Sequence, residues 1–373
     1  MTVAHKQDIT IYVDVPQKNG ETKKFFLTEL NNVQDVHKLA KISKRVAISD
    51  TADLIFRLFA KSQQGDADLK ELSERIPCIN KRYLPNLQHF FDKPENAKII
   101  QEYNSSKDKT HKRELRKQMI DKLEGFVSKY ISTRDLQYNF SKFKYKYDKE
   151  FLSVKDTMSN VANKISAKML GLNPEDPFVM AAFEIWKDNI DKRTEQKRQS
   201  YWLLVRDEQG TIIGITCISS RQLKDKRVDK NIIGHAGCIL DPSVQGCGLA
   251  SALWAVTTDF IYNNMDDDDA ENSLFATTCD EFNENSQGVH VKTGAHVLKD
   301  ENDNVIIDNG KMHWYATKEE IMNSELMKQA AERGVKYTVA YADRRQKRSK
   351  RIGNNQQNAT FNTNIKGFNN ARQ

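Results

Sequence analysis

The sequence is poor in cysteine, and the few cysteines that it has are scattered. Five occur in 373 residues, and no two of them stand in a Cys-x-x-Cys spacing or share the spacing of a zinc site with histidines. The pattern therefore offers neither a disulfide framework nor a zinc module, and it favours a reducing compartment.

Long apolar runs are also missing. The first ten residues, MTVAHKQDIT, lack the apolar core of a signal peptide, and no later window forms a continuous membrane-spanning run. We therefore expect a soluble, cytoplasmic protein with no membrane partner.

An excess of one charge is nearly absent as well. Lys and Arg number 58 against 51 Asp and Glu, which gives a net charge of +7. This mildly basic balance is compatible with nucleic acid or another acidic partner but does not require one. The length suits one large elaborated domain or two smaller ones.

Four segments differ in their patterns. Residues 1–50 predict a hairpin and a helix, and residues 51–198 are mostly helical. Residues 199–318 alternate strands with helices, which predicts a mixed central sheet flanked by helices and an α/β (α+β) fold. Residues 319–373 predict a helix and then a low-complexity tail rich in Asn.

The tail begins with the basic run RRQKRSKR at residues 344–351. Such a run is typical of a nucleic-acid contact, a localisation signal or a docking arm. We therefore expect a nucleic acid or a protein assembly as a partner of the tail.

The stretch DPSVQGCGLASALW, residues 241–254, places two glycines between a predicted strand and a predicted helix. A helix begins with unpaired amides and the positive end of its dipole, and glycines let an anion approach them. A phosphate or pyrophosphate is the natural guest, and a tight turn without a ligand is the alternative. Neither Gly-Lys-Ser/Thr nor a complete Gly-x-Gly-x-x-Gly follows, because Ser251 stands at the last position.

The junction resembles the pyrophosphate loop of the GNAT acetyltransferase superfamily, Gln/Arg-x-x-Gly-x-Gly/Ala, through Gln245, Gly248 and Ala250. A second signal of that family, Asn, seven residues to a Tyr, then Lys-x-Gly-Phe, is matched downstream within NENSQGVHVKTGA. There the matching residues are Asn283, His290, Lys292, Gly294 and Ala295. The resemblance covers about residues 199–317, and residues 25–42 resemble the family's first strand and helix, which would make 50–198 an insertion.

The resemblance implies acetyl-CoA as cofactor and an amine as acceptor, either a small molecule or a protein. Main-chain amides of the loop would bind the pyrophosphate, and the preceding strand, which splays from the next one in this family, would hold the pantetheine arm. The cofactor-binding residues that it implies are Cys238, Ile239, Leu240, Gln245, Gly246, Cys247, Gly248, Leu249, Ala250 and Asn283. No metal is implied.

Two residues are candidates for proton transfer. His290 stands where the family often has a Tyr that protonates the leaving thiolate, and a surface histidine is the alternative. Asp241 ends the predicted strand and is a candidate base, and a turn residue before Pro242 is the alternative.

Two functions follow from these observations. The first is an acetyl-CoA-dependent N-acetyltransferase whose helical region shapes the acceptor site. The second is a catalytically weak or inactive GNAT-fold subunit of an assembly associated with nucleic acid or protein. His290 in the Tyr position, and the absence of an acid within residues 232–240, favour the second.

Overall fold

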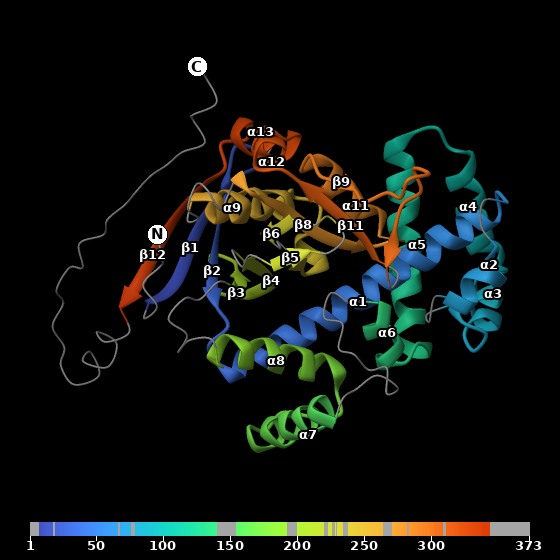
Figure 1. Ribbon diagram of the computed structural model, residues 1–373. Coiled ribbons are helices and arrows are strands. Elements are labelled where there is room, and N and C mark those ends of the chain that lie inside the picture. The colour runs from blue at the N-terminus through green and yellow to red at the C-terminus, as the bar shows by residue number, and fades with distance from the viewer. Residues whose placement is uncertain are drawn as a thin grey trace. The chain divides into compact units, whose positions relative to one another are not determined.

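An antiparallel hairpin opens the fold (Figure 1). Strands β1 (Gln7–Pro16) and β2 (Thr22–Glu29) pair as the alternation of apolar residues predicts, with Ile11 opposite Leu27. This computed structural model describes residues 7–17, 19–65, 68–75, 79–139, 154–191, 200–219, 223–225, 228, 230–233, 238–263, 271–281, 283–308 and 311–343.

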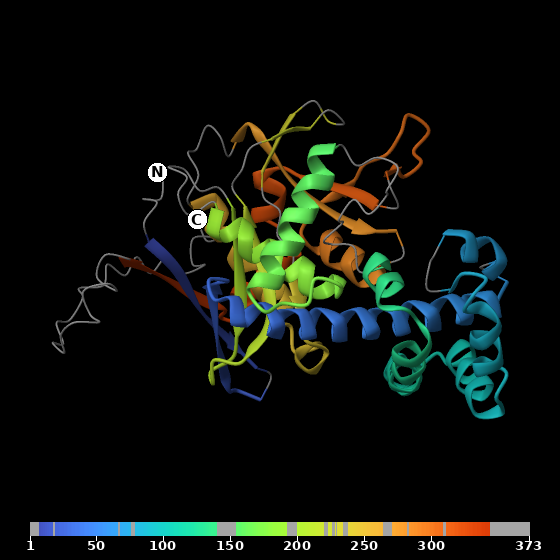
Figure 2. The same cartoon turned by 90° about the horizontal axis from the view of Figure 1, so that it is seen from below.

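The hairpin belongs to a six-stranded antiparallel sheet with the order β12-β1-β2-β3-β4-β7. The sequence predicted only a helix and a tail after residue 318, whereas β12 runs antiparallel along β1, as Figure 2 shows from below. Alternation of Tyr337, Val339 and Tyr341 is the signal that the prediction missed. The remaining strands of this sheet are β3 (Ser200–Arg206), β4 (Ile212–Ser219), β7 (Cys238–Leu240) and β12 (Lys336–Asp343).

A second sheet has the order β10-β11-β8-β6-β5, with β9 paired to β11. Its pairs are antiparallel except for β6 and β8, which run parallel. The predicted mixed sheet is thus present as two sheets. The strands are β5 (Leu223–Asp225), β6 (Lys230–Ile233), β8 (Ser273–Asp280), β9 (His296–Val297), β10 (Ile307–Asp308) and β11 (Lys311–Ala316).

The sheets divide within the segment that the sequence predicted as one strand, residues 231–240. Its first part, β6, pairs with β8 in the second sheet, and its last part, β7, pairs with β4 in the first sheet. Residues 234–237 lie outside the described residues.

Helices pack on these sheets around a common core. The apolar helix α9 supplies much of that core, with Leu253 and Val256 fully buried in the same cluster as Leu27 and Phe275. The short turn η4 (Pro242–Val244) precedes it. The helices that follow the loop are α9 (Leu249–Asn263), α11 (Glu284–Lys292), α12 (Lys318–Met322) and α13 (Glu325–Glu332).

The helical region forms a second core of its own. Phe59 stacks on Phe91 with ring centroids 4.0 Å apart. Arg116 holds the buried carboxylate of Asp53 through two hydrogen bonds of 2.6 Å, and Arg57 is a further partner of that carboxylate. The helices are α1 (Val33–Ser62), α2 (Leu69–Arg75), α3 (Leu84–Phe91), α4 (Pro94–Ser105), α5 (Lys109–Tyr130), α6 (Thr133–Asn139), α7 (Val154–Met169) and α8 (Pro177–Asp191).

The chain folds as two compact units. One combines Met1–Leu39 with Phe183–Gln373, and the other is Ala40–Ala182. The sequence placed the helical region at 51–198, and that boundary stays a prediction. The divisions between the two units fall inside helices α1 and α8. In the described part of the chain, no helix is long and apolar enough to cross a membrane.

Candidate functional site

The loop between β7 and α9 is held by three local side chains. Asp241 accepts hydrogen bonds from the amide and hydroxyl of Ser243, at 3.0 and 2.7 Å. Gln245 Nε2 donates to the carbonyl of Leu240 at 3.2 Å, and Cys247 Sγ donates to the carbonyl of Val244 at 3.0 Å. These side chains therefore stabilise the conformation of the loop through local hydrogen bonds.

The main chain at the start of α9 carries unpaired donors. The amides of Gly248, Leu249, Ala250 and Ser251 have no acceptor among the described residues. The first helical amide to pair is that of Ala252, which donates to Gly248 O at 3.1 Å. Four N–H groups at the positive end of a 15-residue helix are thus available to an anion.

Both glycines of the loop have left-handed backbone conformations, with φ of +79° at Gly246 and +75° at Gly248. A Cβ at Gly246 would meet no atom within 4 Å, whereas a Cβ at Gly248 would collide with the guanidinium of Arg333. Both glycines were expected to let a phosphate approach, and that role stays a prediction. At position 248 the missing side chain also makes room for the guanidinium of Arg333.

Arg333, just after α13, is the residue that sequence reasoning missed. Its guanidinium donates to the carbonyls of Gly248, Cys247 and Pro16 at 3.3, 3.3 and 3.2 Å. The arginine lies 85 residues from the loop in sequence, and no local motif marks it.

Beside the loop, the outer edge of β7, here called the open edge, pairs with no other strand among the described residues. Strand β7 is the last strand of its sheet, and β8 beyond Phe275 pairs only with β11 in the described part of the chain. Asp241 N donates to Ile213 O of β4 at 2.8 Å. Because neighbouring residues of a strand direct their main-chain groups to opposite edges, the amide of Leu240 points away from β4. In the described part of the chain β7 and β8 do not pair, and the role of this edge toward a pantetheine arm stays a prediction.

Close contact between β4 and β7 fixes that edge. Gly214 lies opposite Leu240, and a Cβ at Gly214 would collide with the carbonyl of Ile239. Ile239 and Leu240 are both buried. Only a glycine at 214 lets the two backbones approach this closely.

His290 is buried in the core on α11, with 1% of its surface exposed. Its ring lies 5.4 Å from that of Trp254 and 5.6 Å from that of Trp314, and Nε2 is 3.3 Å from Ser286 Oγ. The alternative of a surface histidine is therefore wrong. The imidazole has almost no contact with solvent in this structure. The general-acid role that the motif position implied stays a prediction.

The other two polar candidates act as helix and turn caps. Asn283 is the N-cap of α11 and accepts from Ser286 N at 3.0 Å. Asp241 caps η4, which is the turn role weighed against catalysis in the sequence analysis. Their contacts give each a structural task, and their roles toward a cofactor or acceptor stay predictions.

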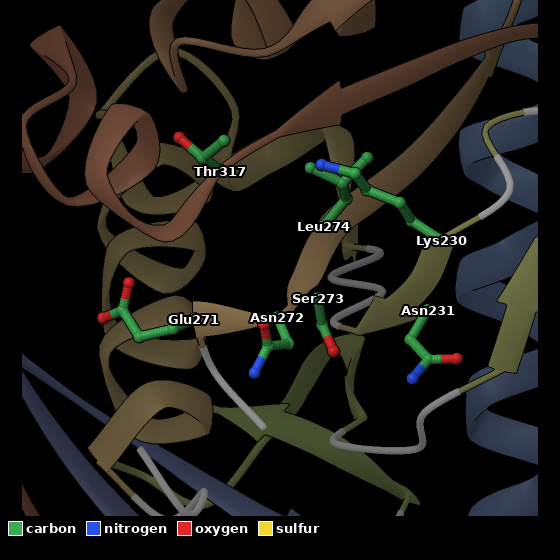
Figure 3. Close-up of a pocket in the computed structure, with 7 residues that line it drawn as sticks. All are labelled: Lys230, Asn231, Glu271, Asn272, Ser273, Leu274 and Thr317. Carbon is green, nitrogen blue, oxygen red and sulfur yellow. The ribbon is translucent and has the colours of Figure 1, made fainter. Parts of the chain in front are cut away.

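A cavity of about 400 Å³ lies at the start of β6 and β8 (Figure 3). The loop instead follows the end of β7, so the cavity is a separate feature. Its lining is mainly polar and comprises Lys230, Asn231, Glu271, Asn272, Ser273, Leu274 and Thr317.

Two further expectations concern a metal ion and the C-terminal tail. No cluster of three or more His, Cys, Asp or Glu side chains suited to a metal is present among the described residues. The basic run at 344–351 and the Asn-rich tail lie outside them. The partner predicted for the tail stays a prediction.

Comparison with known proteins gives structural matches alone. No protein-family model matches the chain, and no curated protein matches it. A solved spermidine N-acetyltransferase SpeG chimera from Vibrio cholerae and hSSAT is 14% identical, with 38% of this chain and 80% of that chain covered and a TM-score of 0.28.

Two further solved structures are similar at the same level. Mycobacterium smegmatis RimJ in complex with CoA-disulfide is 15% identical, with 48% of this chain and 86% of that chain covered and a TM-score of 0.31. A ribosomal-protein-S5-alanine acetyltransferase from Vibrio fischeri is 17% identical, with 40% and 74% covered and a TM-score of 0.28. The SpeG chimera and the Vibrio fischeri protein are both named as acetyltransferases.

Proposed function

We propose that this protein is an acetyl-CoA-dependent N-acetyltransferase that transfers an acetyl group to an amine. The observation that carries the proposal is the row of unpaired amides at Gly248 to Ser251, at the start of α9. An anion of the size of a diphosphate accepts several hydrogen bonds at once, and a helix N-terminus favours its charge.

The open edge of β7 supports a thioester ligand beside that anion site. The Leu240 amide points away from β4, and it is separated from the amides of α9 by one short loop. A long ligand with a diphosphate at one end and a carbonyl at the other fits two such groups of donors. A fixed main-chain donor at a carbonyl oxygen also stabilises the negative charge that develops during acyl transfer.

The chemistry needs little from side chains. Acetyl-CoA supplies the acetyl group as a thioester: the neutral amine attacks the carbonyl carbon, the C–S bond breaks, and an amide and a free thiol result. The amine loses one proton and the thiolate gains one. The chain contributes binding and orientation through the loop amides and the open edge of β7.

Two side chains are proposed to transfer protons, in the roles that the family resemblance implied. His290 is the proposed general acid for the thiolate, and Asp241 is the proposed base. Cofactor contacts are proposed for Gln245, Gly246 and Cys247 through their main chain. The acceptor class, an amine of a small molecule or of a protein, is proposed from the resemblance of the two motifs.

Calorimetric titration with acetyl-CoA tests the proposal. We expect saturable binding to the full chain and a loss of about tenfold or more in affinity in Ala250→Pro, because proline removes one donor at a position that the first turn of a helix tolerates. Glu319→Pro is the matched control, because Glu319 holds the same second helical position in α12 and is exposed.

The control should bind acetyl-CoA as the wild-type protein does. No saturable binding by the wild-type protein would contradict the proposal and leave the alternative of a noncatalytic subunit. Equal affinity in wild type and Ala250→Pro would remove the loop from the binding site.

A further inference from the structure

Arg333 binds carbonyl groups of the loop, and these carbonyls point away from the unpaired amides of Gly248 and Leu249. Its guanidinium donates to the carbonyls of Cys247 and Gly248, and also to Pro16 at the end of β1. It thereby connects three segments that are far apart in sequence.

Because the peptide group is planar, these hydrogen bonds also orient the amides of Gly248 and Leu249. The carbonyl of Cys247 shares a planar peptide group with the amide of Gly248, and the carbonyl of Gly248 shares one with the amide of Leu249. In a trans peptide the C=O and N–H bonds point in opposite directions. Hydrogen bonds from Arg333 to the two carbonyls therefore direct the Gly248 and Leu249 amides away from the arginine.

The charge of Arg333 adds to this effect. Arg333 forms no ion pair with a carboxylate among the described residues, so its positive charge is not neutralised there. It is half-buried, where charges are screened less than at an open surface. A charged donor on each carbonyl also polarises the peptide group and strengthens its N–H as a donor.

From this arrangement we infer that Arg333 is a positioning residue that selects a diphosphate-bearing ligand at the loop. This inference rests on the proposed function and adds the residue that determines specificity for the diphosphate part of the cofactor. The guanidinium acts through the peptide groups of Cys247 and Gly248.

A hydrogen bond of Tyr337 fixes the position of the segment that carries Arg333. The chain turns from α13 into β12 directly after Arg333, and Tyr337 OH donates to Asp259 Oδ2 of α9 at 2.6 Å. The segment that carries Arg333 is thus attached to α9, the helix whose first turn it orients.

The test compares ligands with and without a diphosphate. Binding of acetyl-CoA, inorganic pyrophosphate and S-acetylpantetheine is measured for the wild-type chain, Arg333→Gln and Arg333→Lys. Arg206→Gln is the matched control, because Arg206 also bonds a carbonyl, that of Gly210, and pairs with Asp35 away from the loop.

We expect Arg333→Gln to weaken acetyl-CoA and pyrophosphate binding by about tenfold, which lies in the upper part of the range for partly buried charges at helix ends. Binding of S-acetylpantetheine should not change, because it has no diphosphate. Arg333→Lys should recover part of the loss, since it keeps the charge but not the fork of donors. Arg206→Gln should bind all three ligands as the wild type does.

Equal affinity for acetyl-CoA and pyrophosphate in wild type and folded Arg333→Gln would overturn the inference. An equal loss for S-acetylpantetheine would also overturn it, since that result indicates general structural damage. If Arg333→Gln does not fold, the same comparison with Arg333→Lys decides. Failure of the wild-type chain to bind acetyl-CoA would refute the proposed function separately, and pyrophosphate would then still test the arginine.

Discussion

Substituting the two loop glycines separately should reveal what each one does. Gly246 and Gly248 have nearly the same left-handed φ, so alanine at either position costs about 1–2 kcal/mol in backbone strain. The difference is the environment of the new Cβ. At 246 it enters open space, and at 248 it meets the Arg333 guanidinium.

The guanidinium is the end of a flexible side chain and can move aside. The additional cost of Gly248→Ala is therefore the loss of its hydrogen bonds to the carbonyls of Gly248, Cys247 and Pro16. Bonds from a charged donor that is partly open to water contribute about 1–2 kcal/mol in total here. We expect Gly248→Ala to lower the free energy of unfolding by that amount more than Gly246→Ala does.

Urea unfolding followed by tryptophan fluorescence measures this difference. All four tryptophans of the chain, at 186, 202, 254 and 314, belong to the unit that contains the loop. In the Arg333→Gln background the two alanine substitutions should cost the same, because the additional interaction is already gone. Equal losses in the wild-type background would refute the described contact between Gly248 and Arg333.

Three further predictions concern the open edge, a buried acid and the buried histidine. Gly214→Ala should destabilise the protein by about 1–3 kcal/mol in urea unfolding, because its Cβ meets the backbone of Ile239, which cannot move aside as a side chain can; unchanged stability would show that β4 and β7 are further apart. Burial raises the pKa of Glu184 from 4.5 to about 8. The unfolded chain therefore releases this proton first, and stability falls as the pH rises from about 4.5 to about 8. Glu184→Gln should raise stability at pH 8.5 by on the order of 1–2 kcal/mol, allowing for water access, and change little at pH 4; thermal unfolding at the two pH values checks this, and an equal change at both would contradict it. His290→Ala should lower stability by about 2–4 kcal/mol, since it empties a site between Trp254 and Trp314; wild-type stability in urea would contradict this packing.

Local patterns were sufficient where one element carries the whole signal. The hairpin of β1 and β2 follows from alternation, and the helix α9 follows from its apolar residues. The Gly246 and Gly248 junction was found for the same reason, because a glycine pair at the start of a helix is visible in a few residues.

Burial was harder to predict than periodicity. The stripe of Leu115, Met119 and Leu123 is buried in α5, but a similar stripe in α7 has Val161, Ile165 and Met169 exposed at 54%, 56% and 83%. A stripe shows which face of a helix is apolar. Whether another element covers that face depends on the rest of the chain.

The sequence by itself determined the hairpin of β1 and β2, the helix α9, the strand-to-helix loop and the motifs that resemble an acetyltransferase. Only the tertiary structure decided that β7 pairs with β4 and, among the described residues, not with β8, that His290 is buried, and that Arg333 contacts the loop. Each of these depends on residues distant along the chain that meet through packing and main-chain hydrogen bonds. Contacts of this kind produce no local periodicity or spacing, so they cannot be predicted from a single sequence.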